Sequence, residues 1–132
     1  MRSLSPPESV HALDLDGLCA PDMTFWTLRE GTRDDGRLLG CGALRELDAA
    51  HGEIKSMHTA QAGRRRGTAT RLLAEIEATA RERGYRRLSL ETGRPASFAA
   101  AQGLYRRHGY RECPPFAGYT VDPFSLCMTK EL

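Results

Sequence analysis

The alternation of apolar and polar positions predicts strands in the first half of the chain. Short runs of this kind, bounded by turn residues, cover 24–30, 37–47 and 53–59. The segment GTRDDG at 31–36 is rich in residues that break regular structure, so the first two strands form a predicted hairpin. DAAHG at 48–52 predicts a second turn. Together these runs indicate an antiparallel meander.

Apolar residues recur at helical spacing from Gly67 to Arg83, and Gly84 stands where a C′ glycine belongs. A strand follows at 86–92, and a second helix is predicted over 97–108. We expect Ser97 to be the N-cap of that helix and Gly109 to end it. Two further strands are predicted at 110–113 and 125–132, and a short helix is possible at 7–18.

These elements predict one α+β domain over residues 1–132, because no repeat, linker or low-complexity segment interrupts them. A content of 40% hydrophobic and 27% charged residues is ordinary for a globular protein. The sequence contains no apolar run long enough to cross a bilayer and no signal-peptide core at its start. We therefore expect a cytoplasmic protein that is not bound to a membrane.

The charged and sulfur-containing residues exclude some functions. The net charge of +2 is too small to argue for nucleic acid. The cysteines have no C-x-x-C spacing and no histidine at metal-ligand spacing, so we expect reduced thiols and no metal site. They are Cys19, Cys41, Cys113 and Cys127.

The segment GRRRGTA at 63–69 places three arginines between a predicted strand and a predicted helix. The helix lacks Ser, Thr, Asp or Asn at its N-cap position, so its first amides have no side-chain partner. Free amides, the positive end of the helix dipole and guanidinium groups together favour an anion such as a pyrophosphate. A solvated basic loop and a nucleic-acid patch remain alternatives. The second is the weaker, because no aromatic residue lies nearby.

Two motifs resemble a known family. Arg64-x-x-Gly67-x-Ala69, after a strand and at a helix start, resembles the (Q/R)-x-x-G-x-(G/A) motif of the GCN5-related N-acetyltransferases, the GNAT family. AAAQGLYRRHGY at 99–110 is similar to that family's A-x-x-L-Y-x-x-x-G-(F/Y) segment. Longer stretches, including GCGALRELDAAHGEIKSM at 40–57, resemble a YsnE-like bacterial subgroup, and the similarity covers nearly the whole chain.

The resemblance implies a GNAT-type mixed sheet in which strands 53–59 and 86–92 are parallel neighbours that splay apart. It implies acetyl-CoA as the acyl donor and no metal. The pantetheine arm would lie along Met57, His58 and Thr59. The phosphates would be held by the loop and helix start: Arg64, Arg65, Arg66, Gly67, Thr68, Ala69 and Thr70. The side chains of Arg65 and Arg66 point either to solvent or to the nucleotide phosphate.

Transfer in this family is direct, with an amine attacking the thioester. The resemblance makes Tyr105 the general acid toward the coenzyme sulfur, whereas from its position alone it would be a half-buried helix aromatic. Glu53 is the candidate base, because it precedes Arg64 by 11 residues, as the family's catalytic glutamate does. The alternative for Glu53 is a simple ion pair with Lys55, two residues along on the same face.

The acceptor would bind under the segment CPPFAGYTVDPFS at 113–125. Phe116, Tyr119 and Asp122 are candidate substrate-binding residues, and loop packing is the alternative for each. Glu91, on the outward face of its strand, is a further candidate. His51 and His58 are further candidates, because histidine as a residue type has its ordinary pKa near neutrality, but lone histidines are more often structural.

Family members normally carry a strand and a helix ahead of the elements seen here, so the domain is N-terminally short by comparison. An unpaired sheet edge and an apolar patch would remain, so either another subunit covers them or Met1 is not the natural start. We expect a homodimer or a larger assembly. The leading function is N-acetylation of a small-molecule or peptide amine. A non-catalytic coenzyme-A-binding module is the alternative, and no nucleic-acid partner is expected. The acceptor itself is not identified by the sequence.

Overall fold

The computed structural model describes residues 22–31, 36–64 and 66–132. The possible helix at 7–18 and the expectation of a missing first strand and helix lie outside the described residues. The described elements, in order, are β1 (Met23–Arg29), β2 (Leu38–Asp48), β3 (His51–Thr59), η2 (Gln61–Gly63), α2 (Thr68–Glu82), β4 (Arg87–Gly93), η3 (Ala96–Phe98), α3 (Ala99–Arg107), β5 (Arg111–Cys113) and β6 (Ser125–Glu131).

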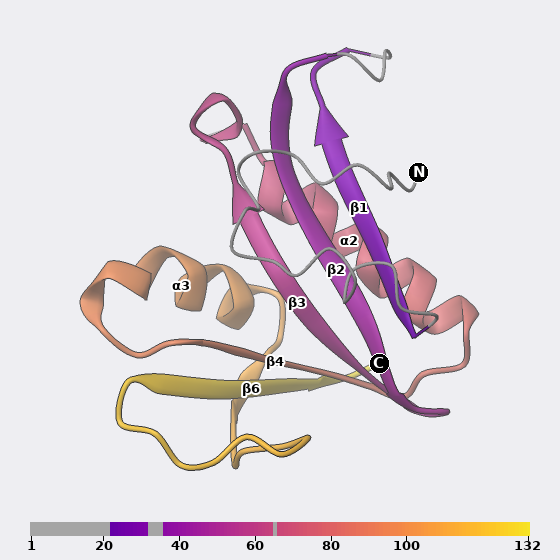
Figure 1. The fold of residues 1–132 in the computed structure, drawn as a ribbon, viewed down its shortest axis with the longest axis vertical. Helices are drawn as coiled ribbons and strands as arrows, with labels where there is room; N and C mark the ends of the chain where they lie inside the picture. Colours follow the sequence, from indigo (N-terminus) through magenta and orange to yellow (C-terminus); the bar gives the residue numbers. More distant parts are fainter. Residues whose placement is uncertain (1–21, 32–35, 65) are drawn as a thin grey trace.

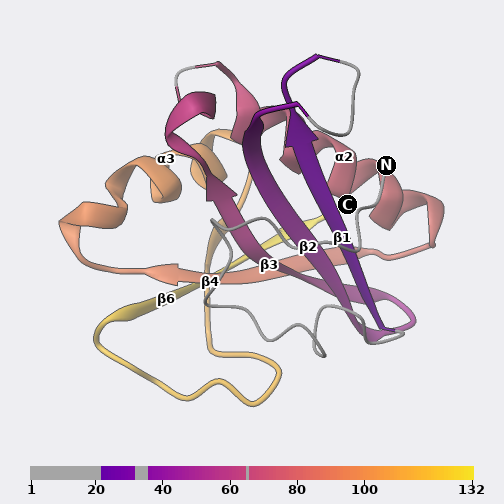
Figure 2. The ribbon, with the colours of Figure 1, turned by 45° about the horizontal axis from the view of Figure 1, so that its top comes forward.

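These strands form one sheet with the order β1-β2-β3-β4-β6-β5. Only β3 and β4 pair in parallel, and the other neighbours are antiparallel. The predicted meander and the mixed sheet are therefore confirmed. In Figures 1 and 2, β1–β3 rise steeply away from β4 and β6, with α2 behind the first group and α3 beside the second.

One main core joins both helices to the sheet. It combines the apolar stripe of α2 with residues of the strands and with aromatic side chains around α3. Among its members are Leu44, Ile54, Leu72, Leu73, Ile76, Leu88, Leu90, Tyr105 and Met128. Because apolar residues of β3 and β4 alternate with polar ones, Glu53 and Ser89 face away from this core, on the other side of the sheet.

Element boundaries differ from the prediction at two places that matter. His51 and Gly52, assigned to a turn, belong to β3, because their backbone pairs with β2 and β4. The Ser97 N-cap is wrong. Ser97 lies within η3, and α3 follows Phe98 with no side-chain cap. Gly84 and Gly109 end their helices at φ values of 83° and 91°, as predicted.

Candidate active site

The gap between β3 and β4 is set by the backbone. Their parallel pairing runs from His51↔Arg87 to Ile54↔Leu90 and stops there, although both strands continue. The predicted splay is confirmed (Figure 2). Beyond Ile54 the edge of β3 that faces β4 has no strand partner in the described part of the chain, so its peptide groups can pair with an extended ligand.

A bulge in β3 accompanies the splay. On β2, Cys41 pairs with His58 and Ala43 pairs with Lys55, so two residues of β3 oppose Gly42. Ser56, in the bulge, has a φ of 60°. A Cβ on Gly42 would meet the Met57 sulfur at 2.6 Å, so this glycine makes room for the bulged strand. The bulge begins two residues after Ile54, where the pairing of β3 with β4 ends, and bulges generally bend the strand that carries them.

Packing and a hydrogen bond fix the start of the arginine loop, the segment 63–67. Thr68 is buried and donates a 2.8 Å hydrogen bond to the Gly63 carbonyl. A Cβ on Gly63 would lie 2.1 Å from the Leu39 carbonyl oxygen, so no other residue fits there without backbone movement. The Thr68 hydroxyl is thus engaged in the loop, and its contribution to an anion site is its amide.

The start of α2 is uncapped, as predicted. Gly67 is the N-cap in the left-handed region at φ 72°, with no side-chain cap and no acidic residue in the first turn. The first bond runs from the Arg71 amide to the Gly67 carbonyl, at 3.0 Å. The amides of Thr68, Ala69 and Thr70 therefore have no acceptor within the helix. A Cβ on Gly67 would meet no described residue within 4 Å, so the position beside the helix start is open with respect to those residues.

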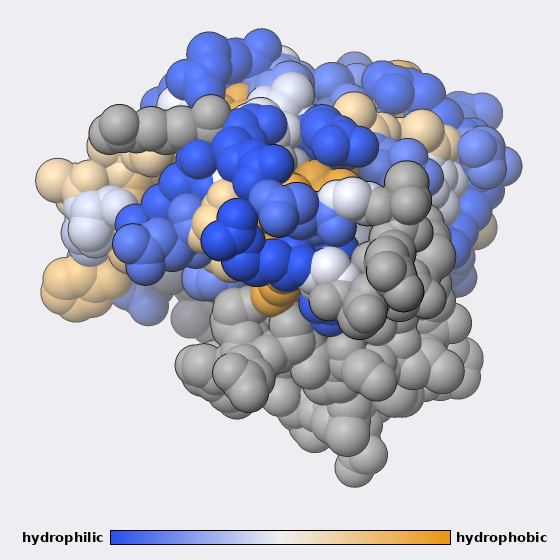
Figure 3. All heavy atoms as spheres, turned by 90° about the horizontal axis from the view of Figure 1, so that it is seen from above, coloured by the Kyte–Doolittle hydropathy of each residue, from blue (hydrophilic) through white to orange (hydrophobic). Residues whose placement is uncertain are grey.

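The arginines differ in what they contact. Arg66 forms a 2.8 Å ion pair with Glu30, which also pairs with Arg37 at 3.1 Å. Hydrogen bonds from Arg66 and Arg37 lower the pKa of Glu30 below its usual value. Arg64 is exposed. Arg65 lies outside the described residues. This end of the molecule, seen from above in Figure 3, is largely hydrophilic.

Tyr105 lies on α3, on the same side of the sheet as α2. It is buried and packs edge-on against Tyr110, with ring centroids 5.8 Å apart. Burial raises the pKa of Tyr105 to about 12. Within the described part of the chain its hydroxyl has no hydrogen-bond partner. Tyr110 is itself anchored, because it donates a 2.8 Å hydrogen bond to Glu77, which Lys130 contacts at 3.0 Å.

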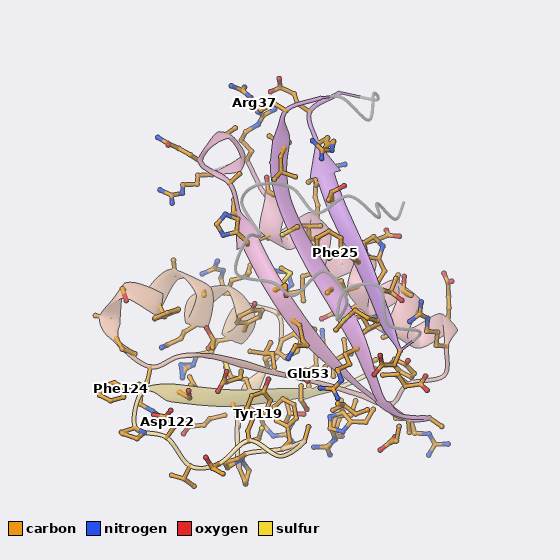
Figure 4. All side chains as sticks on the ribbon, in the orientation of Figure 1. Phe25, Arg37, Glu53, Tyr119, Asp122 and Phe124 are labelled. Atoms are coloured by element: carbon orange, nitrogen blue, oxygen red, sulfur yellow. The ribbon has the colours of Figure 1, made fainter. Side chains whose placement is uncertain are left out.

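Glu53 is the centre of a second cluster, on the opposite face. Its side chain is only 1% exposed. The Tyr119 hydroxyl donates to its Oε2 at 2.6 Å, and Lys55 Nζ lies 3.5 Å from the same oxygen. Lys55 also donates to the Tyr119 hydroxyl at 3.2 Å. The ion pair with Lys55, predicted as the alternative for Glu53, is therefore present, and the hydrogen bond from Tyr119 adds a contact that the sequence did not predict. Figure 4 shows Tyr119 and Glu53 close together over the sheet.

One oxygen of Glu53 has unused capacity. Oε1 is buried and has no hydrogen-bond partner among the described residues. Arg45 NH1 lies 3.9 Å from this oxygen, beyond hydrogen-bonding distance. A buried carboxylate oxygen without a donor is costly, so this atom is suited to receive a proton or a hydrogen bond from a ligand.

The sequence favours a structural role for His51, and the structure places this residue beside the Glu53 cluster. Its ring lies 6.0 Å from that of Phe116, which packs on Tyr119 at 5.2 Å. Nε2 lies 2.7 Å from the Ser89 hydroxyl, which lies 3.0 Å from that of Thr129. Burial lowers the pKa of His51. Only knowledge that residue 51 is in a strand, on the face of Glu53, would have revealed its position.

The hydrogen bonds assign the tautomer of this histidine. Thr129 donates to the Leu88 carbonyl at 3.1 Å, so its oxygen accepts from Ser89. The Ser89 oxygen then accepts from a protonated Nε2 on His51. Neutral His51 consequently keeps its free lone pair on Nδ1.

The other two candidate substrate-binding residues, Glu91 and Asp122, lie in different surroundings. Glu91 is exposed on the face of Ser89, opposite Cys127, and its charge contributes to the raised pKa of Tyr119 after burial and the Glu53 hydrogen bond. Asp122 instead accepts from the Phe124 amide at 2.8 Å and lines a pocket of about 400 Å³ beneath the loop. In Figure 4 Asp122 and Phe124 lie at the far end of the loop from Glu53.

Metal clusters and membrane-spanning helices are two further features that would bear on function. Among the described residues, no group of three or more His, Cys, Asp or Glu side chains is placed to hold a metal ion. No helix within the described ranges is long and apolar enough to cross a membrane.

Comparison with known proteins agrees with this geometry. A model of the Acetyltransferase (GNAT) family matches residues 2–110. The uncharacterized N-acetyltransferase YsnE of Bacillus subtilis (strain 168) is 52% identical over 132 residues, which covers 100% of this chain and 85% of that protein.

Solved structures show the same fold. A Klebsiella pneumoniae protein described as an acyl-CoA N-acyltransferase superimposes with a TM-score of 0.75 at 35% identity, covering 84% of this chain and 73% of the other. A GNAT family acetyltransferase from Elizabethkingia anophelis, solved with acetyl-CoA bound, gives 0.62 at 17% identity, covering 86% and 100%. With the family model and the 52% identical relative, these observations establish that the chain belongs to the GNAT family of acetyltransferases, in a YsnE-like subgroup.

Proposed function

We propose that the protein transfers an acetyl group from acetyl-CoA directly to an amine of a small molecule or peptide, without a metal. The observation that carries the proposal is the edge of β3 that β4 leaves unpaired beyond Ile54. The uncapped start of α2 and the buried Tyr105 belong to the helices on one face of the sheet. The buried Glu53 lies on the other face of β3. A donor and an acceptor approaching from opposite faces would meet at the splay.

The donor half of the site is made largely of backbone. The β3 edge at Met57, His58 and Thr59 pairs with the amide groups of pantetheine as an additional strand would. The open amides of Thr68, Ala69 and Thr70 bind the pyrophosphate at the positive end of α2, assisted by the Arg64 guanidinium. Arg66 joins them only by leaving Glu30, and Arg65 is included from the sequence motif alone.

The acceptor half is anionic and aromatic. Glu53 and Glu91 attract a protonated amine, while Phe116 and Tyr119 cover it from the loop. Asp122, at the far end of that loop, would act on the approaching substrate rather than on the reacting nitrogen. The unpartnered Oε1 of Glu53 supports a ligand hydrogen-bond donor at this position.

The residues then have distinct tasks. Glu53 accepts a proton from the amine, directly or through a water, so that the nitrogen lone pair attacks the thioester carbonyl. As the C–S bond breaks, Tyr105 donates its proton to the leaving sulfur. A phenol with a pKa of about 12 remains protonated at neutral pH and is therefore available as a donor.

Acetyl-CoA binding is tested with a matched pair of glycine variants. Gly67 and Gly84 both have positive φ and open space where a Cβ would lie, at opposite ends of α2. Gly67→Asp adds a negative charge where we place the pyrophosphate, and Gly84→Asp adds the same charge and backbone strain at the far end. We expect calorimetry to show at least tenfold weaker binding in Gly67→Asp and a change below threefold in Gly84→Asp. Equal losses in both folded variants would contradict the donor site.

Turnover separates the enzyme from a non-catalytic coenzyme-A-binding module. We expect the parent chain to release thiol from acetyl-CoA when given a panel of primary amines and peptides. Glu53→Gln keeps the acceptor of the Tyr119 hydrogen bond but is not basic, so kcat should fall by about 10²-fold or more. Glu131→Gln, at the exposed end of β6, is the control. Tight acetyl-CoA binding without thiol release for any amine would favour the non-catalytic module.

A further inference from the structure

The cysteines of β5 and β6 lie directly opposite one another. The register of this antiparallel pair is Arg111↔Thr129, Glu112↔Met128 and Cys113↔Cys127. Opposed residues in such a pair have Cα atoms about 4.5–5.5 Å apart. This range falls within the roughly 4.4–6.8 Å that disulfides span. β5 is a three-residue strand at the end of the described sheet, so it can adjust more easily than an inner strand.

The two cysteines line the same pocket. Both line the pocket of about 400 Å³ under the acceptor loop, together with Pro114 and Pro115. Cys113 is partly exposed, whereas Cys127 is 7% exposed. Cys41 differs from them, because it is completely buried on β2 and its sulfur faces the Ser56 carbonyl at 3.5 Å.

We propose that Cys113 and Cys127 are a reversible redox site, forming an intramolecular disulfide by exchange with a low-molecular-weight disulfide such as oxidised glutathione. In reducing compartments disulfides of this kind are transient and regulatory. A strained or exposed bond is also the type that thiols reduce readily.

The disulfide between Cys113 and Cys127 would form through a mixed disulfide with glutathione. The accessible Cys113 thiolate attacks one sulfur of oxidised glutathione, and the first glutathione leaves as a thiolate. The Cys127 thiolate then attacks the sulfur of Cys113 and expels the second glutathione. The protein loses two S–H bonds and gains one S–S bond, while two electrons reduce oxidised glutathione to two thiols.

The disulfide would join the two ends of the acceptor loop, the segment 114–124. Segment 114–124 begins immediately after Cys113, carries Phe116 and Tyr119, and returns to the sheet just before Cys127. A disulfide between the ends of this segment restricts the positions that the two aromatic residues adopt over Glu53.

Mass spectrometry of the intact chain tests the bond without any activity assay. After incubation with oxidised glutathione, we expect a mass decrease equal to two hydrogen atoms, reversed by dithiothreitol, and a peptide map that links Cys113 to Cys127. Cys19→Ser and Cys41→Ala should retain the change, and Cys113→Ser should lose it. An unchanged mass in the folded protein, a stable mixed disulfide at Cys113, or a bond to another cysteine would overturn the proposal.

The kinetic consequence rests on the proposed function and is tested separately. Oxidation should change the KM for the amine at least threefold and leave the Kd of acetyl-CoA within twofold, because the loop covers only the acceptor face. Cys113→Ser should be insensitive to oxidised glutathione. An unchanged KM in fully oxidised enzyme would overturn the coupling. A chain that forms the disulfide but never acetylates an amine would contradict the proposed function and leave the redox site intact.

Discussion

Glu53 illustrates how much a single position owes to distant parts of the chain. Sequence spacing marks it as a candidate base and Lys55 as its local partner. The structure adds Tyr119, which donates to Oε2 at 2.6 Å, and leaves Oε1 buried without a partner among the described residues. The carboxylate is therefore oriented through one oxygen, while the other is buried and would gain a hydrogen bond from any donor that reaches it.

Among single substitutions, Tyr105→Phe tests the general acid. Removing the hydroxyl should lower kcat by about 10²-fold, the usual contribution of a positioned acid, and leave the Kd of acetyl-CoA within threefold. Tyr110→Phe is the matched control, because it removes the other hydroxyl of the same ring pair, which contacts Glu77 instead. Steady-state kinetics in which both variants lose kcat equally would argue against a proton-donating role.

His51 carries a pH prediction. Its pKa is lowered from the ordinary 6.5, chiefly by burial, so below that pH the unfolded chain takes up a proton more readily than the folded one. The stability that neutral His51 supports is present above pH 6.5 and is lost as the pH falls toward its folded pKa. In urea unfolding, the advantage of the parent over His51→Gln should shrink between pH 7.5 and pH 5. A constant or growing advantage would contradict the assignment.

At the scale of secondary-structure elements, the candidate site depends on where the pairing of β3 with β4 stops. β3 and β4 are predictable strands, but the end of their ladder after Ile54↔Leu90 and the bulge at Ser56 exist only between strands. Likewise, the glycine of the loop motif marks the start of α2, while the loop itself is held by Gly63 and Thr68. The short-range pattern thus locates the elements, and contacts between them open the gap.

Gly63→Ala tests the close packing that fixes the start of the arginine loop. A methyl group at this position would lie 2.1 Å from the Leu39 carbonyl oxygen, so the loop must move, and we expect a loss of about 1–3 kcal/mol in the free energy of unfolding. Gly103→Ala is the control. Its added carbon meets only the flexible Arg107 side chain, at 3.2 Å, and should stabilise α3 by about 0.8–1 kcal/mol. Denaturation showing Gly63→Ala as stable as the parent would contradict the tight fit.

Across the molecule, the sheet separates two chemical environments. The face with α2 and α3 holds the core and the proposed coenzyme groups, and the other face carries Glu53 under the acceptor loop. In the proposed mechanism the donor and the acceptor meet at the splay between β3 and β4. Under that proposal residues as far apart in the chain as Arg64 and Tyr119 would belong to one site.

The outer strand of the described sheet at the other end is β1, whose outer edge has no strand partner among the described residues and could pair with a further strand. We expect a homodimer that covers this end of the molecule. Sedimentation equilibrium at micromolar concentration should give about twice the chain mass of 14.6 kDa. A single monomeric species over that range would contradict the expectation.

Local patterns in the sequence determined every described strand, both α-helices, the uncapped start of α2 and the family motifs around Arg64 and Tyr105. They did so because periodicity, capping and turn chemistry act over a few residues. Tertiary structure alone decided that Tyr119 reaches Glu53, that His51 joins the same face, that Asp122 does not, and that Cys113 opposes Cys127. Those outcomes depend on strand order, register and the path of a long loop, which are set by packing between segments distant in the chain.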